Sequence, residues 1–216
     1  MRIAILGTGV VGETLGTKLV QSGHEVRMGS RTANHEKALA WTRKAGPLAS
    51  QGTFAEAAAF GELLFNCTLG TASVDAVRAA GVENLRGKVL VDVSNPLDFS
   101  KGFPPTLTVT NTDSLGEQLQ RAVPELRVVK TLNTMTASIM VAPSSLPGPH
   151  DVFLCGNDAG AKKQVTGLLV EDFGWPRVLD LGDISAARGM EGVLPLVLRL
   201  YQSFGDFDFN LQIVRR

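Results

Sequence analysis

The amino-terminal stretch Met1–Thr32 constrains the fold more than any other part of the chain. The apolar run Arg2-Ile3-Ala4-Ile5-Leu6 has the length of a strand and leads directly into Gly7-Thr8-Gly9-Val10-Val11-Gly12. A helical pattern with apolar residues at four-residue spacing follows, and a second short strand is expected from Glu25 to Met28. These features predict a β-α-β unit whose turn carries the G-x-G-x-x-G motif of dinucleotide-binding folds.

The three glycines of this motif have separate physical roles. Gly7 permits a tight turn, Gly9 lets the backbone approach a pyrophosphate, and Gly12 lets the helix pack closely on the strand. The free amide groups and the dipole at the start of the helix favour the negative charge of the phosphates. The stretch therefore predicts a bound dinucleotide.

The residues directly after the second strand indicate which dinucleotide binds. NAD-binding folds usually place Asp or Glu there to hold the ribose 2′-hydroxyl. Here the sequence is Gly29-Ser30-Arg31-Thr32, which contains no carboxylate to repel a 2′-phosphate. Arg31 offers a planar set of donors suited to phosphate, and Ser30 and Thr32 offer hydroxyl groups beside it. We interpret the site as one for NADP(H).

Composition excludes several classes of partner. The 216 residues include 21 Lys plus Arg and 21 Asp plus Glu, so no net field attracts nucleic acid or an anionic membrane. No apolar run is long enough to cross a membrane, and no signal-type segment is recognised. Cys67 and Cys155 are the only cysteines, too few for a disulfide framework or a metal cage. We expect a cytoplasmic protein with a small soluble ligand as its partner.

The rest of the chain alternates strand and helix patterns. This predicts an α/β fold of Rossmann type, doubly wound around a mostly parallel sheet, with a C-terminal α/β extension. We expect an NADP-binding domain over residues 1–150 and a β-α-β-α-β extension over residues 151–216 that completes the sheet and the substrate cleft. Further strands are expected at 62–67, 88–93, 127–132, 151–155, 177–181 and 206–214, and helices at 34–44, 53–60, 74–80, 114–122, 161–173 and 184–204, with a surface link at 143–150.

Polar residues follow two of the predicted strands. Thr68–Thr71 come after the strand at 62–67, and Ser94-Asn95-Pro96 come after the strand at 88–93. In an open parallel sheet, the loops at the carboxyl ends of strands line the ligand crevice. We therefore expect both segments to face the cofactor.

The last predicted helix, 184–204, is apolar around more of its circumference than one sheet contact requires. A subunit partner, a bound flat ring, or burial under the terminal strand could cover the remainder. We expect a homodimer built partly on this helix, with Pro195 bending it.

Five motifs together resemble the coenzyme F420-dependent NADP oxidoreductases, and they follow that family's order along the chain. The motifs are residues 7–12, Gly29-Ser30-Arg31, residues 128–134, Cys155-Gly156-Asn157-Asp158 and residues 180–188. Residues 91–96 and 181–194 also resemble the cytosolic NADPH-flavin reductase domain of the STEAP metalloreductases. The resemblance implies hydride transfer between NADPH and a deazaflavin, coenzyme F420, or a flavin such as FAD or FMN.

Position by position, the resemblance also implies a set of binding residues. Its pyrophosphate contacts fall on Thr8, Gly9, Val10 and Val11, and its 2′-phosphate contacts on Ser30 and Arg31. His35 occupies a position where the family often has Lys. The positions near the nicotinamide correspond to Thr68, Leu69, Asn133, Met135 and Ala137. Asn133-Thr134-Met135-Thr136 stands where deazaflavin enzymes resemble His-Thr-Ile-Pro, which leaves the second substrate open.

No side chain is predicted to act as a general acid or base. Tyr201 is the only tyrosine and position 205 is Gly, so the Tyr and Lys four residues apart of short-chain dehydrogenases are absent. The three histidines are expected away from the reacting end of the site. Lys130 could donate a proton at a strand end, but we interpret it as a structural lysine.

Three functions remain open from the sequence. The favoured one is an NADPH-dependent reductase of a tricyclic ring, with Met135 and the last helix forming the wall against the ring. The second is a reductase of a small imine or carbonyl, and the third is a non-catalytic NADPH sensor. Pyrroline-5-carboxylate reductase, an enzyme of the second kind, shares the nucleotide motif but adds a long helical dimerisation domain, for which the 34 residues after Gly182 are too few.

Overall fold

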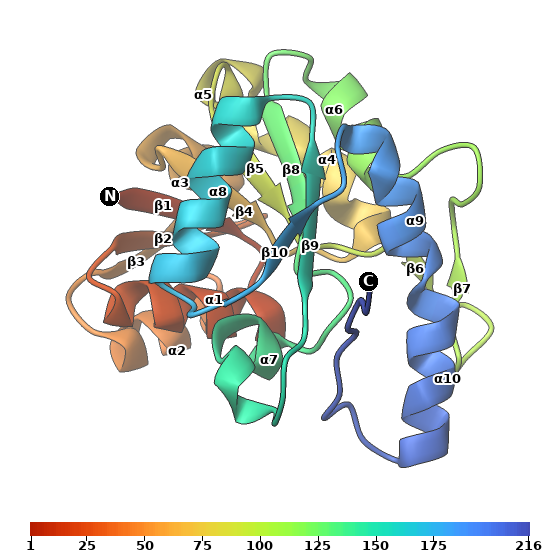
Figure 1. Cartoon of the computed structure of the whole chain (residues 1–216). Coiled ribbons are helices and arrows are strands. Elements are labelled where there is room, and N and C mark those ends of the chain that lie inside the picture. The colour runs from red at the N-terminus through yellow and green to blue at the C-terminus, as the bar shows by residue number, and fades with distance from the viewer.

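The computed structural model describes all residues 1–216 and shows one eight-stranded sheet with helices on both faces (Figure 1). The strand order is β10-β9-β8-β5-β4-β1-β2-β3, and every neighbouring pair is parallel except β8 and β9. The strands are β1 (Arg2–Leu6), β2 (Glu25–Ser30), β3 (Ala49–Thr53), β4 (Leu63–Asn66), β5 (Val89–Asp92), β8 (Arg127–Thr131), β9 (Val152–Gly156) and β10 (Val178–Asp180). The predicted Rossmann-type, mostly parallel fold is confirmed.

The helices connect the strands and cover the sheet. They are α1 (Val10–Gln21), α2 (Glu36–Ala45), α3 (Phe54–Phe60), α4 (Gly70–Ala80), α5 (Val82–Leu85), α6 (Leu115–Ala122), α7 (Ala137–Val141), α8 (Ala159–Glu171), α9 (Ala187–Gly192) and α10 (Leu194–Phe204), with 3-10 turns η1 (Pro143–Ser145) and η2 (Ile184–Ala186). A two-stranded antiparallel hairpin, β6 (Leu97–Asp98) and β7 (Thr106–Leu107), lies outside the main sheet. No helix has the length and apolar character needed to span a membrane.

Each face of the sheet has its own hydrophobic core. Successive residues of β1 belong to different cores: Ile3 and Ile5 pack with α1, α2, α7 and α8, whereas Ala4 and Leu6 pack with α3, α4, α6 and α9. All four side chains are fully buried. Burial of an Ile or Leu side chain contributes roughly 1.5–3 kcal/mol, so β1 is fixed from both sides and holds the following turn in place.

Close packing also fixes α1 behind that turn. A Cβ atom on Gly16 would lie 2.9 Å from Cζ2 of Trp41 on α2, so only glycine fits there without a shift. The indole Nε1 of Trp41 donates a hydrogen bond to Oγ1 of Thr17 at 3.0 Å. The buried ring therefore locks α2 against α1, with its one polar atom satisfied.

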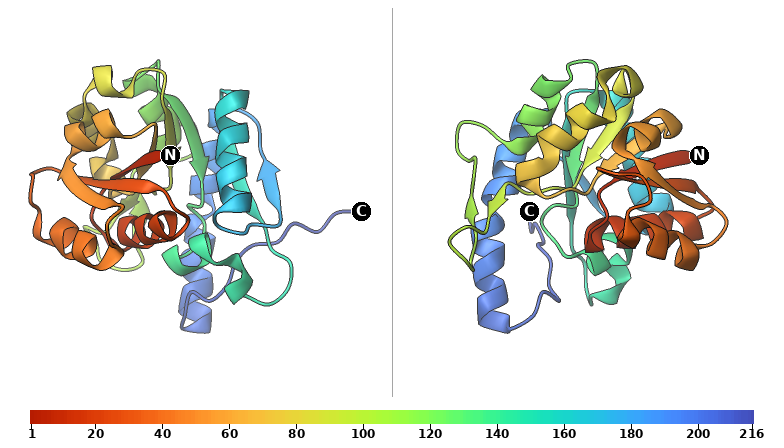
Figure 2. Two further views of the ribbon diagram at one scale, coloured as in Figure 1. Left: turned by 90° about the vertical axis from the view of Figure 1, so that its left-hand side faces the viewer. Right: turned by 180° about the vertical axis from the view of Figure 1, so that it is seen from behind.

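Three expectations about the elements are wrong, and one strand, β3, is not predicted by the sequence pattern. The predicted helix 184–204 is divided into η2, α9 and α10, so Pro195 stands in the first turn of α10 instead of bending a longer helix. Residues 206–214 form no strand, and α10 and the tail after it lie beside the sheet (Figure 2). His150, expected in a surface link, is buried, with Nε2 2.9 Å from the carbonyl oxygen of Pro143.

Candidate functional site

The glycine turn between β1 and α1 has the geometry of a phosphate cradle. Gly7 has φ +121°, and a Cβ atom on it would lie 2.6 Å from the carbonyl oxygen of Cys67. A Cβ atom on Gly12 would overlap the carbonyl oxygen of Gly7, whereas one on Gly9 would meet no atom within 4 Å. Gly7 and Gly12 are therefore needed to build the turn, and Gly9 leaves open space at the start of α1 where phosphates can approach.

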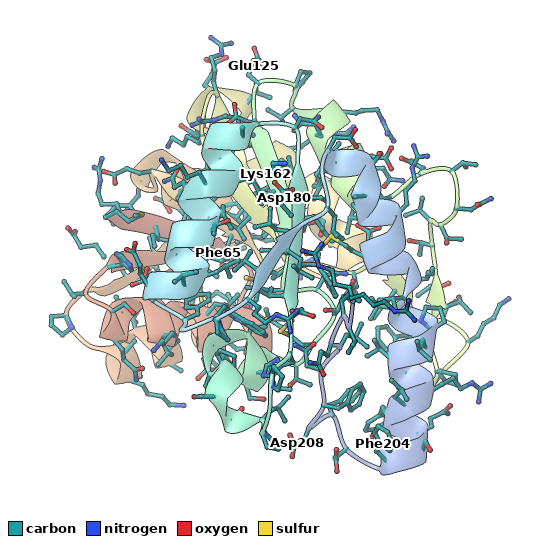
Figure 3. The ribbon with its side chains drawn as sticks, in the orientation of Figure 1. Phe65, Glu125, Lys162, Asp180, Phe204 and Asp208 are labelled. Atoms are coloured by element: carbon teal, nitrogen blue, oxygen red, sulfur yellow. The ribbon has the colours of Figure 1, made fainter.

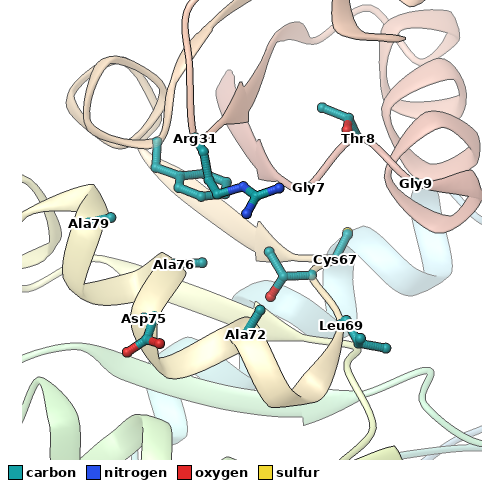
Figure 4. Close-up of a pocket in the computed structure, with 12 residues that line it drawn as sticks. Gly7, Thr8, Gly9, Arg31, Cys67, Leu69, Ala72, Asp75, Ala76 and Ala79 are labelled. Atoms are coloured by element: carbon teal, nitrogen blue, oxygen red, sulfur yellow. The ribbon is translucent and has the colours of Figure 1, made fainter. Parts of the chain in front are cut away.

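A cavity of about 540 Å³ opens beside this turn (Figure 4). Ala72 and Ala76 project from α4 toward the cavity, across from the turn, and the Arg31 guanidinium lies between the two walls. The complete lining is Gly7, Thr8, Gly9, Arg31, Phe54, Cys67, Thr68, Leu69, Ala72, Asp75, Ala76 and Ala79. The small side chains of α4 leave room for a flat base, and the cationic guanidinium of Arg31 suits a phosphorylated ribose.

A second, smaller cavity of about 220 Å³ continues from the first. The two share Cys67, Thr68 and Leu69, so together they form one elongated site at the carboxyl ends of β1, β4 and β5. The smaller cavity is mostly apolar; its lining is Val11, Cys67, Thr68, Leu69, Gly70, Val93, Ser94, Asn95, Leu97, Phe99, Met135 and Met140.

The predicted site residues fall into two groups. Gly7, Thr8, Gly9, Val11, Arg31, Thr68, Leu69, Ser94, Asn95 and Met135 line one or both cavities. Gly12, Val10, Ser30, Thr32, His35, Asn133 and Ala137 line neither. Ser30 is buried and donates its hydroxyl to the carbonyl oxygen of Thr32 at 2.5 Å, so in this structure it braces the loop that carries Arg31.

The wall of the smaller cavity differs from the expectation. No residue of α10 lines either cavity. Leu97 and Phe99, from the β6–β7 hairpin, stand there with Met135. Phe54 and the alanines of α4 were also missed, because nothing in a helical Ala-rich pattern distinguishes a cofactor wall from an ordinary core face.

Hydrogen bonds tie the loops of the smaller cavity to one another. The Thr68 hydroxyl donates to Oδ1 of Asn66 at 2.7 Å, and the Ser94 hydroxyl donates to the carbonyl oxygen of Thr68 at 2.9 Å. Asn95 and Asn133 bond reciprocally across the loops after β5 and β8. Leu132, just before Asn133, is buried with φ +61°, a conformation uncommon for a residue with a side chain. The loops are thus held in one arrangement before any ligand binds.

No strong proton donor faces the smaller cavity. Burial raises the pKa of the Cys67 thiol well above its ordinary value, and the nearby Asp92 carboxylate raises it further, so the thiol stays neutral. Lys130 is completely buried and lines neither cavity. Burial alone would lower its pKa, but Asp92 and Glu191 outweigh that effect and raise it, so Lys130 remains a cation. The structural interpretation of Lys130 agrees with this burial and pairing.

Sequence comparison identifies a family and two kinds of relative. The family described as NADP oxidoreductase, coenzyme F420-dependent, matches residues 2–96. The F420-dependent NADP reductase of Methanocaldococcus jannaschii is 30% identical over 95% of this chain and 96% of its own length. The rat metalloreductase STEAP3 is 30% identical over 99% of this chain, which spans 43% of that longer protein.

Structural comparison gives the same result. A crystal structure of a protein from Arthrobacter sp. FB24, proposed to be an F420-dependent NADP reductase, superposes with a TM-score of 0.94. The two sequences are 50% identical, and the match covers 100% of both chains.

Proposed function

The chain belongs to the coenzyme F420-dependent NADP oxidoreductase family and is an NADP-dependent oxidoreductase; from that premise we propose that its second substrate is a deazaflavin or flavin ring. One observation carries the proposal: the smaller cavity is lined mostly by apolar side chains and presents no strong acid to a substrate. A ring that accepts hydride and exchanges its proton with water needs no such acid. A ketone, whose oxygen must be protonated as hydride arrives, does.

The larger cavity supports the orientation of the nucleotide. Arg31 stands at the end of β2 where a 2′-phosphate would lie, and no carboxylate follows β2 in its place. The open space at Gly9 suits the pyrophosphate. The adenosine half of NADP(H) then occupies the larger cavity and the nicotinamide half extends toward Thr68, Asn95 and Met135 in the smaller one.

The chain's own residues contribute binding and orientation. Bound NADPH would supply a hydride, that is, a hydrogen with its electron pair, to the acceptor ring, and the accompanying proton would come from water. The Thr68–Ser94 and Asn95–Asn133 hydrogen bonds hold the walls of the cavity in one geometry, and Val11, Leu97 and Phe99 contribute apolar surface to its lining. Holding two reactants in register supplies much of the rate enhancement in such a reaction.

The direct experiment is a steady-state assay of NADPH oxidation at 340 nm with separate acceptors. We expect turnover with coenzyme F420, FMN or FAD and none with simple ketones or cyclic imines. Turnover of a ketone or imine above that of every ring would identify a small-molecule reductase. Tight NADPH binding without turnover of any acceptor would identify a sensor.

Exposed apolar residues on α10 support a second part of the proposal, a homodimer. Leu196 and Phe204 are 54% and 59% exposed, and Phe103 of the neighbouring hairpin is 53% exposed. In Figure 1, α10 extends beyond the sheet. Exposed apolar side chains on a helix that projects past the sheet, such as Phe204 near the end of α10 (Figure 3), favour contact with a second copy of the chain.

A further inference from the structure

Lys130 joins carboxylates from two distant parts of the chain in the protein interior. Its Nζ lies 2.8 Å from Oδ2 of Asp92 on β5 and 2.9 Å from Oε1 of Glu191 on α9. None of the three side chains is more than 2% exposed. Removing charges from water costs several kcal/mol per ion, and apolar residues of similar volume often stabilise a fold equally well. The three charges therefore call for a role beyond filling the core.

Glu191 also receives the amino-terminal end of a helix. Its Oε2 accepts a hydrogen bond from the amide of Leu115 at 2.8 Å, and its Oε1 accepts one from the amide of Gly116 at 3.1 Å. These are the first amides of α6, where the helix dipole is positive. The Lys130 ammonium and the positive end of α6 thus balance the two carboxylates of Asp92 and Glu191, and their hydrogen bonds fix the orientation of Glu191.

The network reaches the loops of the smaller cavity without lining it. Nζ of Lys130 donates to the carbonyl oxygen of Ser94, and Oδ1 of Asp92 accepts from the amide of Ser94 at 3.2 Å. The same Oδ1 accepts from Nδ2 of Asn66 at 2.8 Å, and Oδ1 of Asn66 accepts from the Thr68 hydroxyl at 2.7 Å. Both chain segments that shape the cavity after β4 and β5 are therefore bonded to the buried charges.

A third loop is attached through the residue next to Glu191. The carbonyl oxygen of Met190 accepts a hydrogen bond from Nδ2 of Asn133 at 2.8 Å, and Asn133 in turn holds Asn95. Placement of α9 thus determines the position of the loop after β8. Glu191 anchors α9 on one side to Lys130 and on the other to α6.

We propose that Lys130, Asp92 and Glu191 are positioning residues that fix the nicotinamide end of the site. This inference rests on the orientation of NADP(H) proposed above. The buried charges act through the backbone of Ser94: they hold Ser94 against Thr68, and through Ser94 they hold Asn95 in the wall of the smaller cavity. They form no hydrogen bond with the glycine turn or with Arg31, the parts of the site that hold the phosphates of the adenosine half.

Glu191→Gln tests the proposal because it removes one of the two negative charges that pair with Lys130. The substitution changes the volume of the side chain very little. The probes are NADPH, which in the proposed orientation would reach both cavities, and adenosine 2′,5′-bisphosphate, which would reach only the larger one. We expect the Kd of NADPH to rise at least fivefold while the Kd of the bisphosphate stays within twofold, both by isothermal titration calorimetry. The fluorescence enhancement of bound NADPH should also fall, because its nicotinamide is less firmly held.

Arg188→Met is a matched control. The Arg188 guanidinium pairs with Glu117 at 2.6 Å and, like Glu191, joins α9 to α6, but it bonds none of the cavity loops. It should change neither Kd by more than twofold. Lys130→Met and Asp92→Asn provide two further variants if one of the set fails to fold.

A folded Glu191→Gln protein that binds both probes as the wild type does would overturn the proposal. A folded variant that loses affinity for both probes in proportion would do the same. The control showing the same selective loss would also overturn it. These measurements need no acceptor, so failure of every ring acceptor in the turnover assay would reject the proposed function and leave this comparison standing.

Discussion

Asn95 and Asn133 exchange two hydrogen bonds across the loops that follow β5 and β8. Nδ2 of Asn95 donates to the carbonyl oxygen of Asn133 at 2.7 Å, and Nδ2 of Asn133 donates to Oδ1 of Asn95 at 2.9 Å. Asn133 is 2% exposed, and its amide also donates to Met190. The pair therefore connects the cavity wall at Asn95 to the C-terminal part of the chain.

Asn133→Ala should destabilise the fold and weaken NADPH binding together. It leaves Oδ1 of Asn95 and the carbonyl oxygen of Met190 without their donors, which costs about 1–3 kcal/mol for buried groups. Urea unfolding and NADPH titration measure the two effects. Ser138→Ala, an exposed change nearby, should stay within about 0.5 kcal/mol of the wild type. Equal losses of stability and of NADPH affinity in the two variants would contradict a special role for the asparagine pair.

Gly9→Ala and Gly12→Ala should separate binding from folding. A Cβ atom on Gly9 meets no protein atom within 4 Å, and its φ of −82° suits any residue, so Gly9→Ala should fold normally. The added methyl group occupies the space for the pyrophosphate, and the Kd of NADPH should rise at least about tenfold, or about 1.4 kcal/mol. Gly12→Ala overlaps the Gly7 backbone and should lower the free energy of unfolding by about 1–3 kcal/mol. Normal NADPH affinity in Gly9→Ala would contradict the phosphate assignment.

The glycine turn and Arg31 could be predicted as neighbours because they lie on one β-α-β unit, whereas the wall opposite them, Phe54 and the alanines of α4, could not. Gly7, Gly9 and Gly12 follow a clear strand pattern, and Arg31 follows the next strand, so topology alone brings them together. The acceptor half depends on contacts distant in sequence. Leu97 and Phe99 reach the cavity through a hairpin with no strong strand pattern, which sequence periodicity does not reveal.

Two errors in the predicted elements have clear physical causes. The edge strand β3 reads Ala-Ser-Gln-Gly-Thr and lacks the apolar alternation by which strands are recognised. The tail after Gly205 has that alternation, but its apolar side chains pack on α10 and form no sheet pairing. The ring of Phe207, for example, stacks on that of Tyr201 with the centroids 4.0 Å apart. The tail backbone bonds to the rest of the chain only at isolated points such as Asp151. Tertiary contacts thus replaced the predicted sheet pairing.

Arg31→Ala should alter the preference between nucleotides. Loss of a charge-assisted phosphate contact costs roughly 1.5–3 kcal/mol, so the Kd of NADPH should rise about ten- to a hundredfold while that of NADH changes little. Arg43→Ala is the control, since Arg43 is exposed on α2 and lines neither cavity. Equal losses of NADPH and NADH affinity would refute a contact between Arg31 and the 2′-phosphate.

Acid should weaken the start of α6. Hydrogen bonds from the Arg121 guanidinium at 2.8 and 2.9 Å hold the pKa of Asp113 down to about 2, below its ordinary value of 3.8. A carboxylate with a lowered pKa stabilises the fold above pH 3.8 and loses that contribution as the pH falls toward 2. Because Arg121 is largely exposed, we expect its ion pair with Asp113 to contribute less than about 1 kcal/mol to the free energy of unfolding. Urea unfolding of Asp113→Asn should show a deficit near neutral pH that vanishes near pH 2; a deficit independent of pH would exclude the titration.

The exposed apolar face of α10 predicts which substitutions separate the proposed dimer. Leu198 is 7% exposed and Tyr201 stacks on Phe207, so both side chains of this helix serve the monomer's own packing. Leu196 is 54% exposed on the same helix. A charge at Leu196 should therefore disrupt association without disturbing the fold, because burying an unpaired carboxylate in an apolar interface is strongly unfavourable.

Sedimentation velocity at micromolar concentration measures this effect directly. We expect the wild type to sediment as a dimer and Leu196→Glu as a monomer, with the same circular dichroism spectrum. Val170→Glu places the same charge on an exposed apolar position of α8 and should remain dimeric. A monomeric wild type would refute the dimer altogether. A dimer that persists in Leu196→Glu would place the interface on another surface, since burying a carboxylate in an apolar contact is unfavourable.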